Sequence, residues 1–187
     1  MPEKPNWPVV AALLLIVLLA AWLRWTSLGD SLWIDEHHTA WIVAQDLDDV
    51  APRAMIGNQS PLVYWPFWGY IQFAGLNEFA LRLPFFLASL IVVALVYGLV
   101  WSWTRSLMGA ITAGLLVAIY DNAIYYGVES RIYAAVQLAG LCHLLLFASL
   151  LYRPTWWRRV VWVVLGALLL HLHYTAGLLL AAECVAY

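Results

Sequence analysis

The sequence predicts an all-α integral membrane protein with about five transmembrane helices and amphipathic juxtamembrane helices in a long first extracytoplasmic loop. Hydrophobic residues make up 65% of the chain and charged residues only 11%. A water-soluble fold could not bury that much apolar surface. Long uncharged runs recur along the chain, and the charges between them segregate by sign. These three observations place the chain in a bilayer.

Five apolar runs are the predicted spans, because a transmembrane helix needs about 20 mostly apolar residues. They cover about 7–25, 83–104, 106–120, 132–152 and 160–182. A signal peptide is the alternative for the first run. Its end, Arg24-Trp25-Thr26, has no small-residue cleavage pattern, so we favour an uncleaved helix.

The charges predict how the protein is oriented. This topology puts five cations on one side of the membrane, namely Lys4, Arg105, Arg153, Arg158 and Arg159. By the positive-inside rule that side is cytoplasmic, together with the N-terminus. We therefore expect a multi-pass protein of a bacterial or archaeal plasma membrane, with its active site outside. The outer face is acidic, which excludes nucleic acid as a partner.

Two amphipathic helices are predicted in the first outer loop, about residues 26–82. After Asp35, apolar residues recur with helical spacing as far as Leu47. A second helix begins at Ser60-Pro61, an N-cap followed by proline at the first helical position. Six large aromatic residues between Tyr64 and Phe73 favour the headgroup level for this helix, and Pro66 is expected to kink it.

The third span is short, which affects the hairpin that follows it. A helix over 106–120 rises about 22 Å, less than the roughly 30 Å hydrocarbon core. The hairpin of residues 121–131 should therefore dip into the outer leaflet. Its ionisable groups would cost about 2.5 to 3.5 kcal/mol each at that depth unless they are paired or hydrated. A protein-lined, water-filled cavity is the expected solution.

Four motifs occur in an order that resembles a known family. They are Trp33-Ile34-Asp35-Glu36, Ser60-Pro61-Leu62-Val63-Tyr64-Trp65, Asn77-Glu78-Phe79-Ala80-Leu81-Arg82-Leu83-Pro84 and Glu129-Ser130-Arg131-Ile132-Tyr133-Ala134. The chain resembles C-type membrane glycosyltransferases, especially the protein O-mannosyltransferase and aminoarabinose transferase branch. The resemblance covers essentially the whole chain but only the N-terminal part of such an enzyme, so further spans are expected after it.

The resemblance implies transfer of a sugar from a polyprenyl phosphate to an acceptor hydroxyl at the extracytoplasmic membrane face, with inversion at the anomeric carbon. The acceptor would be a glycan, lipid or protein. Such chemistry needs a carboxylate to take the hydroxyl proton and cations to stabilise the departing phosphate. No cofactor is expected, and no divalent metal is indicated.

The resemblance also implies roles for individual residues. Asp35 matches the catalytic carboxylate, with Glu36 beside it, and Arg82 and Arg131 are candidates to bind the donor phosphate. The remaining candidates for substrate binding are Glu129, Gln59, Tyr64, His173 and Tyr174. Gln59 departs from the family, in which many relatives have a basic or histidine side chain before this motif. A neutral amide cannot supply a cation to phosphate.

Structural explanations compete with several of these roles. Asp35 could cap a helix that begins at Glu36. Glu78 and Arg82, four residues apart, could form an ion pair on one helix. Glu129 and Arg131 could satisfy one another inside the hairpin. His173 and Tyr174 could make a buried structural hydrogen bond, and the hairpin tyrosines could be interface anchors.

Three further interpretations remain open: a metal site, a transporter or channel, and an inactive fragment. His37 and His38 adjoin Asp35, but neighbouring residues on a helix point about 100° apart and seldom ligate one metal ion. A small transporter or channel could use Asp35, Glu129, Arg131 and His173 as a polar path, and a truncated inactive fragment is a third possibility. The long aromatic first loop suits a lipid-donor enzyme better than a compact carrier.

Overall fold

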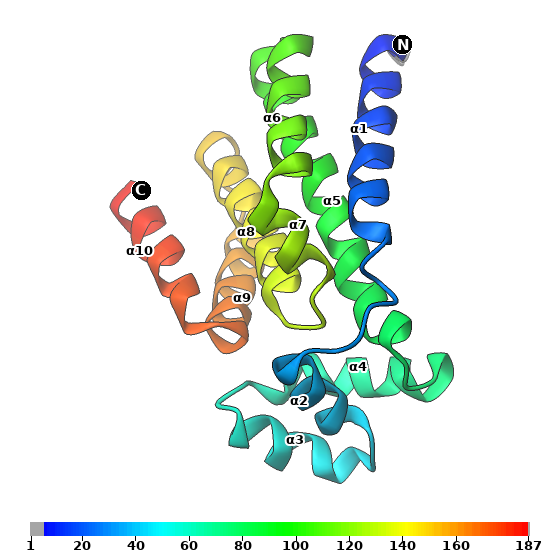
Figure 1. Ribbon diagram of the computed structural model, residues 1–187. Helices are drawn as coiled ribbons and strands as arrows, with labels where there is room; N and C mark the ends of the chain where they lie inside the picture. Colours follow the sequence, from blue (N-terminus) through cyan, green and yellow to red (C-terminus); the bar gives the residue numbers. More distant parts are fainter. Residues whose placement is uncertain (1–5, 187) are drawn as a thin grey trace.

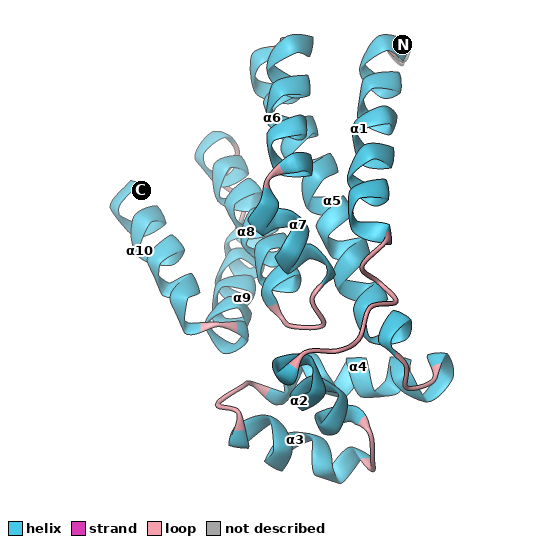
Figure 2. Cartoon of the chain, viewed as in Figure 1, coloured by secondary structure: helices cyan, strands magenta, loops and turns pink. Residues whose placement is uncertain are grey.

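The structure is a computed structural model that describes residues 6–186, and throughout this range the elements are helices joined by turns and loops (Figures 1 and 2). In chain order the helices are α1 (Trp7–Trp25), α2 (Ile34–Val43), α3 (Leu47–Ile56), α4 (Pro61–Ala74), α5 (Glu78–Thr104), α6 (Leu107–Ile119), α7 (Asp121–Val128), α8 (Tyr133–Tyr152), α9 (Trp156–Leu172), a 3₁₀ turn η1 (Tyr174–Ala176) and α10 (Gly177–Ala186).

Three helices, α1, α5 and α8, are long and apolar enough to cross a membrane. A fourth span results if α6 and α7, which meet at a bend of 60°, are counted together. Large apolar side chains such as Leu14, Leu18 and Ile91 are exposed on the outside of these helices. Exposed apolar surface of this extent fits lipid and not water. The predicted class of all-α membrane protein is therefore confirmed, with fewer spans than expected.

The prediction of one continuous fifth span over 160–182 is wrong. Helix α9 ends at Leu172, η1 turns the chain, and α10 runs back along α9 (Figure 1). The antiparallel arrangement is shown by contacts at three levels, which join Leu170 to Gly177, Gly166 to Leu180 and Trp162 to Glu183. Locally, the His173 ring accepts a hydrogen bond from the Thr175 backbone and caps the turn.

The predicted irregular hairpin at 121–131 is also mostly helical. Helix α7 covers Asp121–Val128, and only residues 129–132 connect it to α8. The bend before α7 leaves the last carbonyls of α6 without helical partners. The Arg24 guanidinium supplies those partners, because it donates to the carbonyls of Ala118 at 2.9 Å and Val117 at 3.3 Å.

Helices α2, α3 and α4 form a layer across one end of the bundle, which we call the end layer (Figure 1). The helix predicted after Asp35 is present but is split in two by a break at residues 44–46. The helix predicted at Ser60-Pro61 is confirmed as α4, and Ser60 accepts from the Leu62 amide. A buried apolar cluster, including Val43, Tyr64 and Phe85, joins this layer to α5 and α8.

A close helix approach at Gly127 positions α7 against the bundle. A Cβ atom at this residue would lie 2.9 Å from the Ser89 side chain and 3.0 Å from Nε of Arg24. Both distances are shorter than ordinary van der Waals contact. Only glycine therefore lets α7 pack this closely on α1 and α5.

We expect Gly127→Ala to reduce the free energy of unfolding by about 1 to 3 kcal/mol, because the added methyl group overpacks the interface. Gly98→Ala is the matched control, since nothing lies within 4 Å of a Cβ there, and alanine should favour helix α5. Thermal unfolding in detergent compares the two variants. Equal melting temperatures would contradict the packing argument.

Candidate active site

A buried ion pair between Glu36 and Arg82 connects the end layer to the bundle. Nε of Arg82 donates to Oε1 of Glu36 at 2.8 Å, and Nη2 donates to Oε2 at 2.6 Å. The two side chains are 1% and 6% exposed. This two-bond geometry is the strong form of a carboxylate–guanidinium pair. The predicted pair between Glu78 and Arg82 does not form, because Arg82 on α5 points to α2 instead.

Glu36 has two further hydrogen-bond partners, so each of its carboxylate oxygens accepts two hydrogen bonds. Its Oε1 accepts from the Ser130 amide at 2.9 Å, and its Oε2 accepts from the Trp33 amide at 3.3 Å. Burial alone acts to raise the pKa of Glu36, but the Arg82 side chain and the two amides outweigh it and lower the pKa. Glu36 is therefore an ionised anchor, and the structure favours a positioning role for it over the catalytic role predicted beside Asp35.

A cavity of about 450 Å³ lies beside this pair, and we call it cavity A. Its polar wall comes from the loop before α2, from Glu36 and Arg82, and from α7 with Glu129. The remaining wall includes Trp33 and Tyr125. Cavity A therefore occupies the place expected for a protein-lined cavity beside the short third span.

Glu129 is buried in the wall of cavity A without a hydrogen-bond partner among the described residues. Its side chain is 3% exposed, and both carboxylate oxygens are unpaired. Burial raises the pKa of Glu129 to about 7, Arg131 opposes the shift, and the carboxylates of Glu36 and Asp35 add to it. A carboxyl group with such a pKa can exchange a proton near neutral pH. The expected pairing of Glu129 with Arg131 is not seen.

Arg131 is held by Gln59 and lies next to Asp35. In the amide orientation that satisfies both neighbours, the Gln59 oxygen accepts from Arg131 Nη1 at 2.7 Å and Nη2 at 2.9 Å, and the amide nitrogen donates to the Tyr64 hydroxyl. Nη2 of Arg131 lies 3.9 Å from Oδ2 of Asp35. Gln59 carries no charge itself, but it orients the Arg131 guanidinium. Tyr64, which is fully buried, holds Gln59 in turn.

Asp35 is not the N-cap of α2. The N-cap position is Trp33, the helix begins at Ile34, and Asp35 lies in its first turn. The Asp35 side chain is 44% exposed. It therefore remains accessible from outside while its neighbour Glu36 is sealed in the interior, and a favourable helix dipole supports the negative charge.

A second cavity, cavity B, has a volume of about 520 Å³. It is lined by Gln59 and Arg131 and by the turn between α9 and α10, which contributes His173 and Tyr174. His173 also bonds Thr175. That bond is exposed, and Tyr174 is 79% exposed, so the buried structural hydrogen bond considered for His173 and Tyr174 is not seen. Both side chains line cavity B instead.

Aromatic rings form a continuous row between the two cavities. Neighbouring ring centroids along the row are 4.9 to 6.5 Å apart. The row consists of Trp33, Tyr125, Tyr126, Tyr133, His173 and Tyr174. Sequence reasoning favoured separate interface anchors for Tyr125, Tyr126 and Tyr133 and missed the row, because its members come from different elements.

All nine residues predicted for the site therefore lie in one region at the end-layer side of the bundle. Glu36, Arg82 and Glu129 line cavity A, whereas Gln59, Arg131, His173 and Tyr174 line cavity B. Asp35 and Tyr64 contact these groups from the side. Sequence reasoning missed the backbone amide of Ser130, for which no sequence signal exists.

Comparisons with known proteins find no match to this chain among protein-family models, curated proteins or solved structures.

Arg82→Met should lower the free energy of unfolding by about 3 to 5 kcal/mol, because it leaves the Glu36 charge buried and unpaired. Combining it with Glu36→Met should recover most of the loss. Arg105→Met is the control, since the Arg105 side chain is exposed and forms no salt bridge in the described part of the chain, so its loss should change stability by no more than about 0.5 kcal/mol. An Arg82→Met variant as stable as Arg105→Met would exclude the proposed anchor.

The raised pKa of Glu129 predicts a pH dependence of stability. The folded state binds the Glu129 proton more tightly than the unfolded chain, whose pKa is near 4.5. Unfolding free energy is therefore lost as pH rises from about 4.5 to about 7. Glu129→Gln removes this titration, so it should gain about 3 kcal/mol over the wild type at pH 8 and nothing at pH 4.5. Parallel melting curves across that range would contradict the assignment.

Proposed function

We propose that this chain carries part of the active site of a glycosyltransferase that moves a sugar from a polyprenyl phosphate to an acceptor hydroxyl at the membrane surface. The observation that supports this most is the accessible Asp35 carboxylate 3.9 Å from the guanidinium of Arg131, which lines cavity B. The four motifs that resemble C-type glycosyltransferases contain both residues.

In the proposed reaction Asp35 is the general base. Its carboxylate accepts the proton of the acceptor hydroxyl while the hydroxyl oxygen forms a bond to the anomeric carbon. The bond from that carbon to the phosphate oxygen of the donor breaks on the opposite face, which inverts the configuration. The phosphate leaves with the electron pair.

Arg131 is proposed to stabilise the phosphate as its charge develops. Its guanidinium is already oriented by Gln59, and its Nε is buried without a partner among the described residues. A fixed cation loses little conformational freedom when phosphate binds, and its interaction strengthens as the phosphate leaves. Arg82 is a weaker candidate for phosphate contact because Glu36 and the carbonyls of Ser27 and Asp30 occupy its donors.

The aromatic row offers apolar ring faces near both cavities. A sugar ring or a prenyl chain has C–H groups that pack on such faces, while Glu129 in cavity A can bond sugar hydroxyls. The exposed apolar flanks of α5 and α8 would meet the lipid tail of the donor in the bilayer.

A transporter is the competing proposal, because Asp35, Glu129, Arg131 and His173 are polar groups near membrane depth. A transport path would have to continue through the bundle. The buried arginine, histidine and acidic side chains farther along the described bundle are Arg24, His143 and Glu183, and each is hydrogen-bonded to protein groups. The enzyme proposal is therefore the better supported.

Asp35→Asn should abolish transfer of labelled sugar from a polyprenyl phosphate to acceptor, because the amide cannot take the hydroxyl proton. The assay uses membranes that contain the protein. Asp48→Asn, an exposed acidic position in the first turn of α3, is the control and should keep activity. Transfer by Asp35→Asn at the wild-type rate would overturn the role of Asp35. The transporter would be favoured if the wild-type protein carried substrate into proteoliposomes without forming a glycosylated product and Asp35→Asn lost that flux.

Arg131→Gln should raise the KM for the donor about tenfold or more, since a hydrogen bond to a charged group contributes about 1.5 to 3 kcal/mol. Arg53→Gln removes a cation of the end layer that has no place in cavity A or B and is the control. An unchanged KM for the donor in Arg131→Gln would show that Arg131 has only a structural role.

A further inference from the structure

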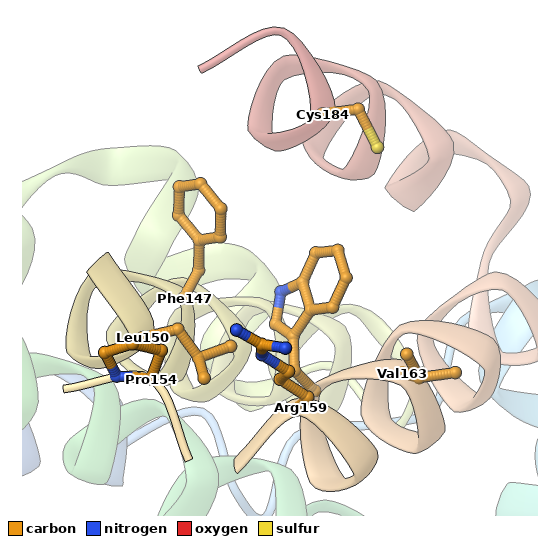
Figure 3. A pocket seen from close by; sticks show the side chains of 7 residues that line it. Phe147, Leu150, Pro154, Arg159, Val163 and Cys184 are labelled. Carbon is orange, nitrogen blue, oxygen red and sulfur yellow. The ribbon is translucent and has the colours of Figure 1, made fainter. Parts of the chain in front are cut away.

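A groove between α8, α9 and α10 lies outside the candidate active site. It has a volume of about 380 Å³. Figure 3 shows Phe147, Arg159 and Cys184 around its opening, with Leu150, Pro154 and Val163 beside them. Apart from Arg159, the labelled lining is uncharged. The groove is thus an apolar slot with one cation at its edge.

The Arg159 guanidinium forms no salt bridge within the described part of the chain. Arg153 and Arg158 lie close by in sequence, and Arg158 donates to the Arg153 carbonyl at 2.8 Å, at the end of α8. The same connection carries no acidic residue. Positive charge therefore gathers at this edge of the groove.

The floor of the groove is held by a buried polar cluster. Nε1 of Trp162 donates to Oε2 of Glu183 at 3.0 Å, and the same carboxylate pairs with Nδ1 of His143 at 3.1 Å. Nε2 of His143 donates to the Trp162 carbonyl at 3.0 Å, since a carbonyl only accepts. At Gly166 a Cβ would lie 3.1 Å from this nitrogen, so glycine is needed for the approach.

This cluster makes the groove a formed feature of the fold. Its hydrogen bonds connect α8, α9 and α10. The His143 side chain is 0% exposed and the Glu183 side chain is 2% exposed. Trp162 is thereby fixed in orientation, and its ring stacks on His143. A rigid slot costs little entropy when a ligand enters it.

We propose that the groove binds an anionic phospholipid, with the phosphate at Arg159 and an acyl chain along Phe147, Leu150 and Val163. Val163 is 60% exposed on the side of the bundle, where lipid is the surrounding medium. Trp156 and Trp157, both exposed, lie one turn or less from Arg159. Aromatic rings at this position are typical of the headgroup level. Basic pockets between membrane helices recognise anionic headgroups by the same physics.

The test measures thermal unfolding of the delipidated protein in detergent with added phosphatidylglycerol, phosphatidylcholine or inorganic phosphate. Phosphatidylglycerol should raise the melting temperature more than either of the others. Arg159→Gln should weaken the apparent affinity for phosphatidylglycerol about fivefold, the equivalent of about 1 kcal/mol for one arginine near a headgroup.

Arg105→Gln is the matched control, because Arg105 is the C-cap residue of α5 and does not line the groove. It should retain the wild-type response. Val163→Trp keeps every charge and fills the slot, so it should also lose the response while the unliganded protein stays folded. An equal effect of phosphatidylcholine or of inorganic phosphate, or an equal loss in Arg105→Gln, would overturn the proposal.

Discussion

The buried pair of Glu36 and Arg82 is the interaction on which the candidate site depends. Removing two charges from solvent is costly, and the cost is offset only when their hydrogen bonds are satisfied. Here Arg82 also donates to the Ser27 and Asp30 carbonyls, and Glu36 accepts two backbone amides. One pair thereby joins α2, α5, the loop before α2 and the segment after α7.

This anchor explains why two adjacent carboxylates have different environments. Glu36 faces the interior and is neutralised by Arg82, so Asp35, about 100° farther round the helix, faces outward. The amide of Ser130 is held by Glu36 at 2.9 Å. Its neighbours Glu129 and Arg131 are therefore directed into cavity A and cavity B, and Arg131 comes next to Asp35.

Features that depend on local sequence could be predicted. The apolar length of α1, α5 and α8 indicated spans, and Ser60-Pro61 marked the start of α4. The turn at His173 was missed because its cap depends on one side chain inside an apolar run. Nearby Glu78 was the only partner that spacing offered for Arg82, as an alternative to phosphate, but Glu36, 46 residues away, holds it. Pairing over that distance depends on packing, and no spacing in the sequence encodes it.

We propose that Asp35 and Arg131 together form the reaction centre for a polyprenyl-phosphate sugar. The decisive experiment is a structure of the protein with a non-hydrolysable analogue of such a donor. The phosphate should lie within salt-bridge distance of Arg131, with the anomeric carbon open to a hydroxyl held by Asp35. An analogue bound with its phosphate away from Arg131, while Arg131 remains on Gln59 and Asp35, would contradict it.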